Sequence, residues 1–233
     1  MIDYYVGVWA GGRYREGRFL RAPAIREKVD AVIAGKVKNA YALVRPPGHH
    51  ATADVGMGFC LFANVAVAIH HARAAHRVGR IATVDWDVHH GNGTQSLFYG
   101  DGTTLTISLH QDNLFPANSG GLAETGEGAG KGYNLNIPLP PGSGDGAYIA
   151  AFERVVLPAL SRFKPELIVV PSGFDASGVD PLGRMMVSSE GYRRMTALLM
   201  KAADAAMYQA KETGRGRMYH FDAMLAERER RKE

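Results

Sequence analysis

Apolar and polar positions change along the first part of the chain in blocks that predict helices and strands in turn. Residues 25–33 carry apolar side chains at helical spacing, and the pattern stops at a glycine. Residues 40–44 look like a short buried strand, and an alanine-rich helical segment follows at 61–76. Residues 80–88 begin with a β-branched apolar run of strand type. The order predicted is helix, strand, helix, strand.

The second part of the chain continues this alternation. Strands are predicted at 103–109, 133–137 and 166–170, and a helix at about 146–162. Strands that alternate with helices are typical of a mostly parallel sheet with helices on both faces. We therefore expect a three-layer α/β fold, in which active sites gather at the carboxyl ends of the strands.

Length and composition are those of one sizeable domain. The chain has 233 residues, of which 46% are hydrophobic, enough for one well-buried core. A short aromatic segment at 4–9 is compatible with a further strand. The net charge of +4 comes partly from a basic run at 228–232, so charge predicts no nucleic-acid partner.

The cysteine content and the lack of targeting signals indicate the cellular compartment that we expect for the protein. Cys60 is the single cysteine, which excludes an internal disulfide and fits a reducing compartment. The sequence has no signal peptide pattern and no apolar run of membrane-spanning length, so we expect a cytoplasmic protein without a membrane partner.

The densest group of polar residues follows the strand predicted at 80–88. Because strand side chains alternate, Asp85, Asp87 and His89 project from one face. A strand that simply leaves the core can also end in aspartate and glycine. Two carboxylates and two imidazoles within six positions, however, are costly to bury unless they are paired or bound to a cation. The stretch predicts a metal or catalytic site.

Histidines occur in two other places. His49 and His50 follow a Pro-Pro-Gly turn, whose stiff backbone can aim both rings, and histidine titrates near neutral pH. This favours proton transfer over a turn that merely contains histidines. His70, His71 and His76 lie in an ordinary helical pattern with no carboxylate nearby in sequence, and we interpret them as surface or satisfied helix residues.

Six motifs follow one another along the chain. They are Arg45-Pro-Pro-Gly-His49-His50, Gly58-Phe59-Cys60, Asp85-Trp-Asp87-Val-His89-His90-Gly-Asn92-Gly-Thr-Gln, Ser108-Leu-His110, Asn136-Ile-Pro-Leu-Pro-Pro-Gly, and Ser172-Gly-Phe-Asp175 with Asp180-Pro-Leu182-Gly. In this order they resemble the zinc-dependent histone deacetylase superfamily, with its class II and acetylpolyamine amidohydrolase-like branch the most similar. The resemblance covers about residues 25–200 and implies an arginase/deacetylase-like fold, incomplete at the termini.

The resemblance implies roles for the polar residues. Asp87, His89 and Asp175 would bind a catalytic Zn²⁺. The proton-transfer pair would be His49 and His50. Asp85 would orient the first ring and Asn92 the second, with the assignment of general base and general acid left open.

Further matches concern a second cation and the substrate. A structural K⁺ site would use Asp85, Asp87, His89, Ser108 and Leu109, largely through backbone oxygens. Gly58 and Phe59 with Phe115 and Leu182 would line a narrow acyl-lysine tunnel, against the alternative of plain core packing. The implied reaction is zinc-dependent hydrolysis of acetyl-lysine or acetylpolyamine, and the sequence does not choose between these substrates.

The sequence departs from the family pattern toward its C-terminus. The family places an oxyanion-stabilising tyrosine in a Gly-Gly-Tyr motif, and no such motif follows Met200. Residues 203–217 instead resemble the C-terminal helix and turn of a diguanylate cyclase domain. We therefore expect a partial deacetylase-like domain at 1–200 and a helical tail at 201–233. An incomplete sheet edge would favour pairing into a homo-oligomer.

Two alternatives remain open at this stage. One is a zinc-binding remnant that has lost turnover together with the tyrosine. The other is a binuclear manganese ureohydrolase, for which Asp85 and Asp180 would have to supply ligands to a second metal, although the Pro-Pro-Gly-His-His turn argues against it.

Overall fold

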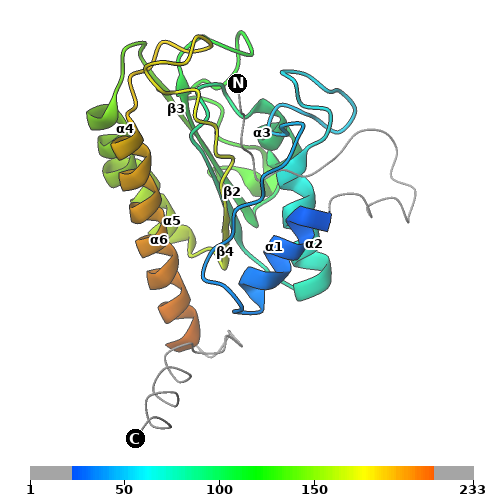
Figure 1. The fold of residues 1–233 in the computed structure, drawn as a ribbon. Helices are drawn as coiled ribbons and strands as arrows, with labels where there is room; N and C mark the ends of the chain where they lie inside the picture. Colours follow the sequence, from blue (N-terminus) through cyan, green and yellow to red (C-terminus); the bar gives the residue numbers. More distant parts are fainter. Residues whose placement is uncertain (1–22, 213–233) are drawn as a thin grey trace, which may run out of the picture.

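A four-stranded parallel sheet forms the centre of the molecule (Figure 1). The structure is a computed structural model that describes residues 23–212. Its strands are β1 (Ile81–Asp85), β2 (Thr104–Gln111), β3 (Asn134–Leu139) and β4 (Leu167–Val169), in the order β3-β2-β1-β4. All three pairings are parallel, and Asp85 at the end of β1 lies opposite Ser108 of β2. The residue that ends β1 is thus held by its pairing with β2.

Helices cover both faces of this sheet (Figure 1). One group consists of α1 (Pro23–Ile33), α2 (Asn64–His76) and the short α3 (Asn92–Phe98). The other consists of α4 (Asp145–Ala151), the π-helical η3 (Phe152–Val156), α5 (Leu157–Phe163) and α6 (Ser189–Glu212), and a short 3₁₀ turn, η2 (Gly128–Gly130), precedes β3. The predicted three-layer α/β fold is confirmed.

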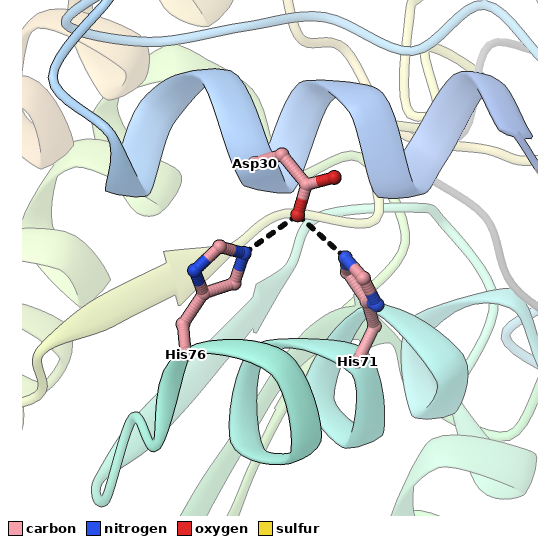
Figure 2. Close-up of side chains that lie close together, drawn as sticks. All are labelled: Asp30, His71 and His76. Atoms are coloured by element: carbon pink, nitrogen blue, oxygen red, sulfur yellow. Dashed lines mark hydrogen bonds and ion pairs between the residues drawn. The ribbon is translucent and has the colours of Figure 1, made fainter.

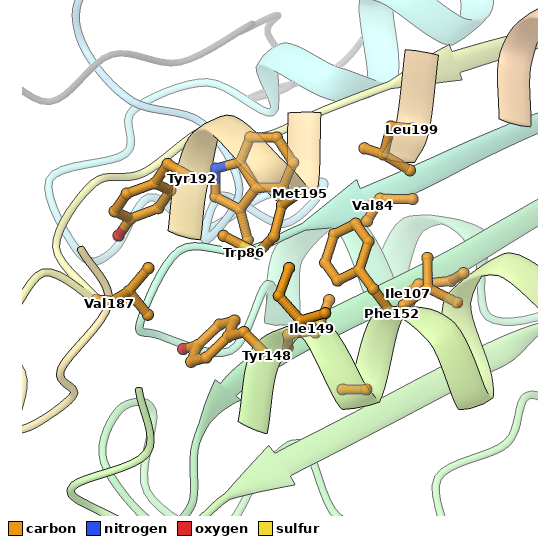
Figure 3. Close-up of a cluster of buried hydrophobic side chains, with 14 of the residues drawn as sticks. Val84, Trp86, Ile107, Tyr148, Ile149, Phe152, Val187, Tyr192, Met195 and Leu199 are labelled. Atoms are coloured by element: carbon orange, nitrogen blue, oxygen red, sulfur yellow. The ribbon is translucent and has the colours of Figure 1, made fainter. Parts of the chain in front are cut away.

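Strand alternation distributes the core between the two helical layers. Ala82 and Val84 belong to the cluster packed against α4–α6, whose members include Phe152 (Figure 3). Ile81 belongs to the cluster on the side of α1 and α2. Asp85 is four positions after Ile81 on the same strand, so both side chains lie on the side of the sheet that faces α1 and α2.

Most predicted elements occur within a few residues of their expected positions. The helix predicted at 146–162 is one continuous helical run, α4–η3–α5, with a π-helical middle. The helix predicted at 61–76 begins at Asn64, whose side-chain amide donates to the carbonyl of Pro46 at 2.8 Å. α6 runs through residue 200 without a break, and the division at 200 and 201 stays a prediction.

The predicted buried strand at 40–44 is wrong. Only Val44 occupies an isolated bridge position, and the rest of the segment has no strand structure. Tyr41 is 47% exposed and Leu43 is 64% exposed, whereas Ala42 is buried. An interior strand of a parallel sheet needs apolar contacts on both faces, and here only alternate side chains are covered.

Two further points concern the ends of the chain and membrane-spanning helices. The aromatic segment at 4–9 and the tail beyond 212 lie outside the described residues. Among residues 23–212, no helix combines the length and the apolar composition that crossing a membrane requires.

Candidate metal centre and histidine pair

The polar side chains at and just after the carboxyl end of β1 are buried or nearly so. The backbone N–H of Asp87 donates to Oδ1 of Asp85 at 3.1 Å, and the N–H of His89 donates to Oδ1 of Asp87 at 2.8 Å. Each carboxylate thus caps the backbone two residues ahead, which suits aspartate in a turn. Asp85 and Asp87 are buried and His89 is nearly so.

Asp87, His89 and Asp175 converge on one point. Nδ1 of His89 lies 2.9 Å from Oδ1 of Asp87 and 2.9 Å from Oδ2 of Asp175. The other oxygen of Asp175 accepts a hydrogen bond from the N–H of Val88 at 2.8 Å, which ties the loop after β4 to the end of β1. The three ligand atoms all lie within 4.8 Å of one another.

This donor set fits a zinc ion. One imidazole nitrogen and two carboxylate oxygens are donors that Zn²⁺ takes, and three protein ligands leave a position open, as in catalytic sites. Electrostatics favours a cation there. Burial and the neighbouring charge of Asp87 raise the pKa of the Asp175 carboxyl to about 7, because two carboxylates in one buried site repel.

Two glycines make room for this group. A Cβ on Gly173 would lie 2.2 Å from Oδ2 of Asp87, and a Cβ on Gly91 would lie 2.5 Å from Oδ2 of Asp85. Both distances are far inside van der Waals contact. The backbone therefore approaches the carboxylates more closely than any side chain would allow.

His49 and His50 stand beside the metal group, each with a different partner. Nδ1 of His49 lies 2.8 Å from Oδ2 of Asp85, and its Nε2 lies 3.7 Å from Oδ2 of Asp87. Nδ1 of His50 lies 2.7 Å from Oδ1 of Asn92. The two ring centroids are 3.9 Å apart. The structure thus brings each ring next to the residue predicted to orient it.

The environment separates the pKa values of the two rings. Burial disfavours the charge on His49, but the carboxylates of Asp87 and Asp85 outweigh it and raise the pKa to about 9. Burial and the adjacent His49 lower the pKa of His50 to about 2. Two titratable groups pushed apart in this way suit general acid and base chemistry. A cation beside Asp87 would offset part of the rise at His49.

The turn that carries the histidine pair is anchored to two helices. The carbonyl of His49 accepts from the N–H groups of Gly93 and Thr94 at 2.9 and 3.1 Å. A Cβ on Gly48 would lie 2.3 Å from Cβ of Asn64, the first residue of α2. The rings are therefore positioned by α2 and α3 as well as by Asp85 and Asn92.

The predicted substrate residues fall into two groups. Phe115 meets the ring of His50 edge-on, with centroids 4.9 Å apart at 88°, and Gly58 packs so closely that a Cβ would lie 2.2 Å from Cδ2 of His50. Phe59 is 76% exposed with a φ of 62°, and Leu182 is half-buried. A role for these four residues in substrate binding stays a prediction.

A hydrogen-bond network behind the site was not predicted from the sequence. His90 is buried, and its ring contacts the hydroxyl of Ser119 at 3.0 Å and Oε1 of Gln95 at 3.1 Å. The same oxygen of Gln95 accepts from the side-chain amides of Asn134 and Asn136 at 2.8 and 2.9 Å. The sequence signal for this network was the pair of asparagines at alternate positions of one strand, because their side chains point to the same face.

Ser108 and His110 of β2 also lie near the metal group. The hydroxyl of Ser108 accepts from the N–H of Gly91 at 3.3 Å and lies 3.0 Å from Nδ1 of His110. The Nε2 of His110 lies 3.1 Å from the carbonyl oxygen of Gly120. The potassium site built on Asp85, Asp87, His89, Ser108 and Leu109 stays a prediction. A small cavity adjoins these residues and is lined by Thr83, Asp85, His90, Gly91, Thr94, Gln95, Thr106, Ile107, Ser108, Asn134 and Asn136.

Comparison with known proteins places the chain in a family. The histone deacetylase domain model matches residues 13–214, and the chain belongs to this family. It is 55% identical over 193 residues to the histone deacetylase-like amidohydrolase of Pseudomonas aeruginosa, covering 83% of this chain and 50% of that protein. It is 44% identical over 205 residues to histone deacetylase clr3 of Schizosaccharomyces pombe, covering 85% of this chain and 29% of that protein.

A solved structure agrees with these relatives. The crystal structure of the HDA15 HD domain superposes with a TM-score of 0.74 at 45% identity, covering 77% of this chain and 51% of that chain. The present chain therefore spans about half the length of this structure and of the Pseudomonas aeruginosa relative.

Proposed function

We propose that this chain carries the centre of a zinc-dependent amidohydrolase that removes acetyl groups from amines. The observation that supports this most is the convergence of Asp87, His89 and Asp175 directly beside the His49–His50 pair. When bound by these three residues, zinc supplies a Lewis acid that polarises the acyl carbonyl and promotes ionisation of water.

The histidine pair handles the protons of amide hydrolysis. His50, whose pKa is held low, is neutral near pH 7 and can accept a proton from water through its Nε2 atom, because Nδ1 faces Asn92. His49 is held charged by Asp85 and Asp87 and stabilises negative charge that develops beside it. The amine leaves as a neutral group only after it gains a proton, which this pair can deliver.

Family membership and the position of Phe115 support the proposed substrate class. Relatives are named as an amidohydrolase and as histone deacetylases, which points to acetylated amines such as acetyl-lysine or acetylpolyamine. The ring of Phe115 is T-shaped to those of both His50 and His89, with centroids 4.9 and 6.0 Å away, and would flank a slender acyl chain.

A second candidate is a zinc-binding protein without turnover. The observation behind it is that the described residues hold the metal group, while this sequence, which covers 50% of the Pseudomonas aeruginosa relative, includes no Gly-Gly-Tyr motif after Met200. Loss of one oxyanion donor costs about 10²–10³ in rate. Zinc binding and catalysis must therefore be tested on the same sample.

The positions of Asp85 and Asp180 argue against the manganese ureohydrolase alternative. Within the described part of the chain, the ligand group contains neither Asp85 nor Asp180. Asp85 contacts His49 instead, and Oδ1 of Asp180 accepts from the N–H of Leu182 at 2.9 Å.

The test combines metal analysis with a deacetylase assay. Purified protein is loaded with Zn²⁺, its metal content is measured, and hydrolysis of an acetyl-lysine peptide and of an acetylpolyamine is followed. We expect Asp87→Ala and Asp175→Ala to remove the catalytic zinc and all turnover. Asp180→Ala, on the loop that carries Asp175, is the control and should keep its zinc. Unchanged zinc content in the first two variants would overturn the ligand assignment, and zinc without turnover would favour the second candidate.

A further inference from the structure

A second group of metal-ligating side chains lies between α1 and α2, built from residues outside the site described above. Asp30 projects from α1 toward α2, where His71 and His76 point back at it (Figure 2). Nε2 of each histidine lies 2.6 Å from the same oxygen, Oδ1 of Asp30. The two rings stand almost perpendicular, with centroids 5.7 Å apart at 88°. Three ligand atoms on two helices therefore meet at one point.

The spacing of these atoms suits a small divalent ion. All three lie within 4.8 Å of one another. Around tetrahedral zinc, with bonds of about 2.0–2.1 Å, neighbouring ligand atoms are about 3.3 Å apart. Each nitrogen would need to move away from the carboxylate oxygen by about 0.7 Å, which lies within the reach of side-chain rotation.

The exposure of the group suits exchange of an ion with solvent. The side chains of Asp30, His71 and His76 are 48%, 11% and 26% exposed. The second carboxylate oxygen of Asp30 points away from both rings (Figure 2). An ion bound here would keep water in its remaining positions, and its ligands are partly desolvated already.

We propose that Asp30, His71 and His76 form a second metal site that takes Zn²⁺ or a similar first-row divalent ion and ties α1 to α2. Imidazole nitrogens favour these ions over Mg²⁺ or Ca²⁺. The Nε2 atoms of both rings already face one carboxylate oxygen. With an ion bound, both rings would carry a proton on Nδ1 and offer Nε2 to the metal.

The site would stabilise the helical layer that positions the histidine pair. α2 carries His71 and His76 near its C-terminal end, and its first residue, Asn64, bonds the turn before His49 through the carbonyl of Pro46. A ligand that binds only the folded chain raises the midpoint of thermal unfolding as its concentration rises.

Zinc stoichiometry tests this proposal. Equilibrium dialysis against Zn²⁺ alone, followed by metal analysis, should give two ions per chain in the unaltered protein. Asp87→Ala/Asp175→Ala should retain one ion, and the addition of His71→Gln/His76→Gln should remove it. His70→Gln is the matched control, since this exposed histidine precedes His71 on the same helix and packs by Phe98. Its metal content should not change.

The outcomes separate this site from the catalytic one. If His71→Gln/His76→Gln alone lowers the count by one, the second site is supported even where the Asp87 variants fail to fold. If Asp87→Ala/Asp175→Ala changes nothing while the histidine variants do, the proposed function fails and the second site stands. An unchanged count in His71→Gln/His76→Gln, or equal loss in His70→Gln, overturns the proposal. As a second readout, Zn²⁺ should raise the unfolding temperature of Asp87→Ala/Asp175→Ala only while His71 and His76 are present.

Discussion

Nδ1 of His49 lies 2.8 Å from Oδ2 of Asp85, at the point where β1 leaves the sheet. This contact joins a ring from a loop to the last residue of an interior strand. Both side chains are buried. The position of His49 is therefore set by the sheet as much as by its own turn.

Asp85→Asn should separate this positioning role from metal binding. Loss of the carboxylate charge lowers the pKa of His49 from about 9, and substitution of such supporting residues typically costs about 10–100-fold in activity. We expect kcat to fall by that factor while zinc content is unchanged. Steady-state kinetics and metal analysis on one sample check this. A variant that loses its zinc would show that Asp85 acts through Asp87 instead.

Gly173→Ala should damage the metal group without removing a ligand. The new Cβ would meet Oδ2 of Asp87 at 2.2 Å, so the carboxylate or the loop must move. We expect zinc affinity to fall by at least tenfold. Gly146→Ala is the control, because its Cβ meets nothing within 4 Å and the residue lies in α4. Competition with a zinc-binding dye gives both affinities, and equal values would contradict the prediction.

Phe152→Ala should destabilise the fold through its core. Phe152 is fully buried and its ring lies 6.3 Å from that of Trp86 (Figure 3). Truncation of such a side chain costs about 3–5 kcal/mol. Val155→Ala, in the same π-helical segment but 37% exposed, should cost less than about 1 kcal/mol. Urea unfolding measures both, and similar losses would show that Phe152 is not central to the core.

Asp101→Asn should remove a pH-dependent contribution to stability. Burial alone would raise the pKa of Asp101, but hydrogen bonds from Thr103 and Thr104 outweigh it. With a further bond from Nη1 of Arg73 at 2.8 Å, the pKa falls to about 2, below its ordinary value of 3.8. A lowered carboxylate pKa stabilises the fold fully above about pH 4, and this stabilisation disappears as the pH falls toward 2.

The expected cost of Asp101→Asn is therefore about 1–2 kcal/mol at pH 7 and less at pH 3. Urea unfolding of both proteins at the two pH values gives the difference. A cost that does not change with pH would assign the effect to lost hydrogen bonds that do not depend on charge.

The sequence patterns predicted the sheet well because each strand has a local signal, an apolar run at β1 and β4 and an alternation of apolar and polar residues at β2 and β3. β1, β2, β3 and β4 all occur where residues 80–88, 103–109, 133–137 and 166–170 predicted them. Residues 40–44 failed because strand composition does not say whether both faces will be covered, and here alternate side chains face solvent.

The site was predictable to the extent that it is local or follows the sheet. Asp87 and His89 are two positions apart, and Asp175 follows another strand whose carboxyl end lies at the same edge. The contacts of Gln95 with Asn134 and of Asp30 with His71 join segments far apart in the chain. They depend on the packing of helices and strands against each other, which no local pattern encodes.

Gly58, Gly91 and Gly173 contribute no functional group. A Cβ placed on any of the three would nevertheless lie within 3 Å of a ring or carboxylate of the site. In a comprehensive mutational scan, these three positions should tolerate substitution as poorly as the ligands themselves. Sensitivity to substitution would then mark residues that leave room for the reacting groups as well as the reacting groups themselves. A chemical role should therefore be assigned to a sensitive position only when its side chain carries a group that can react, bind or donate.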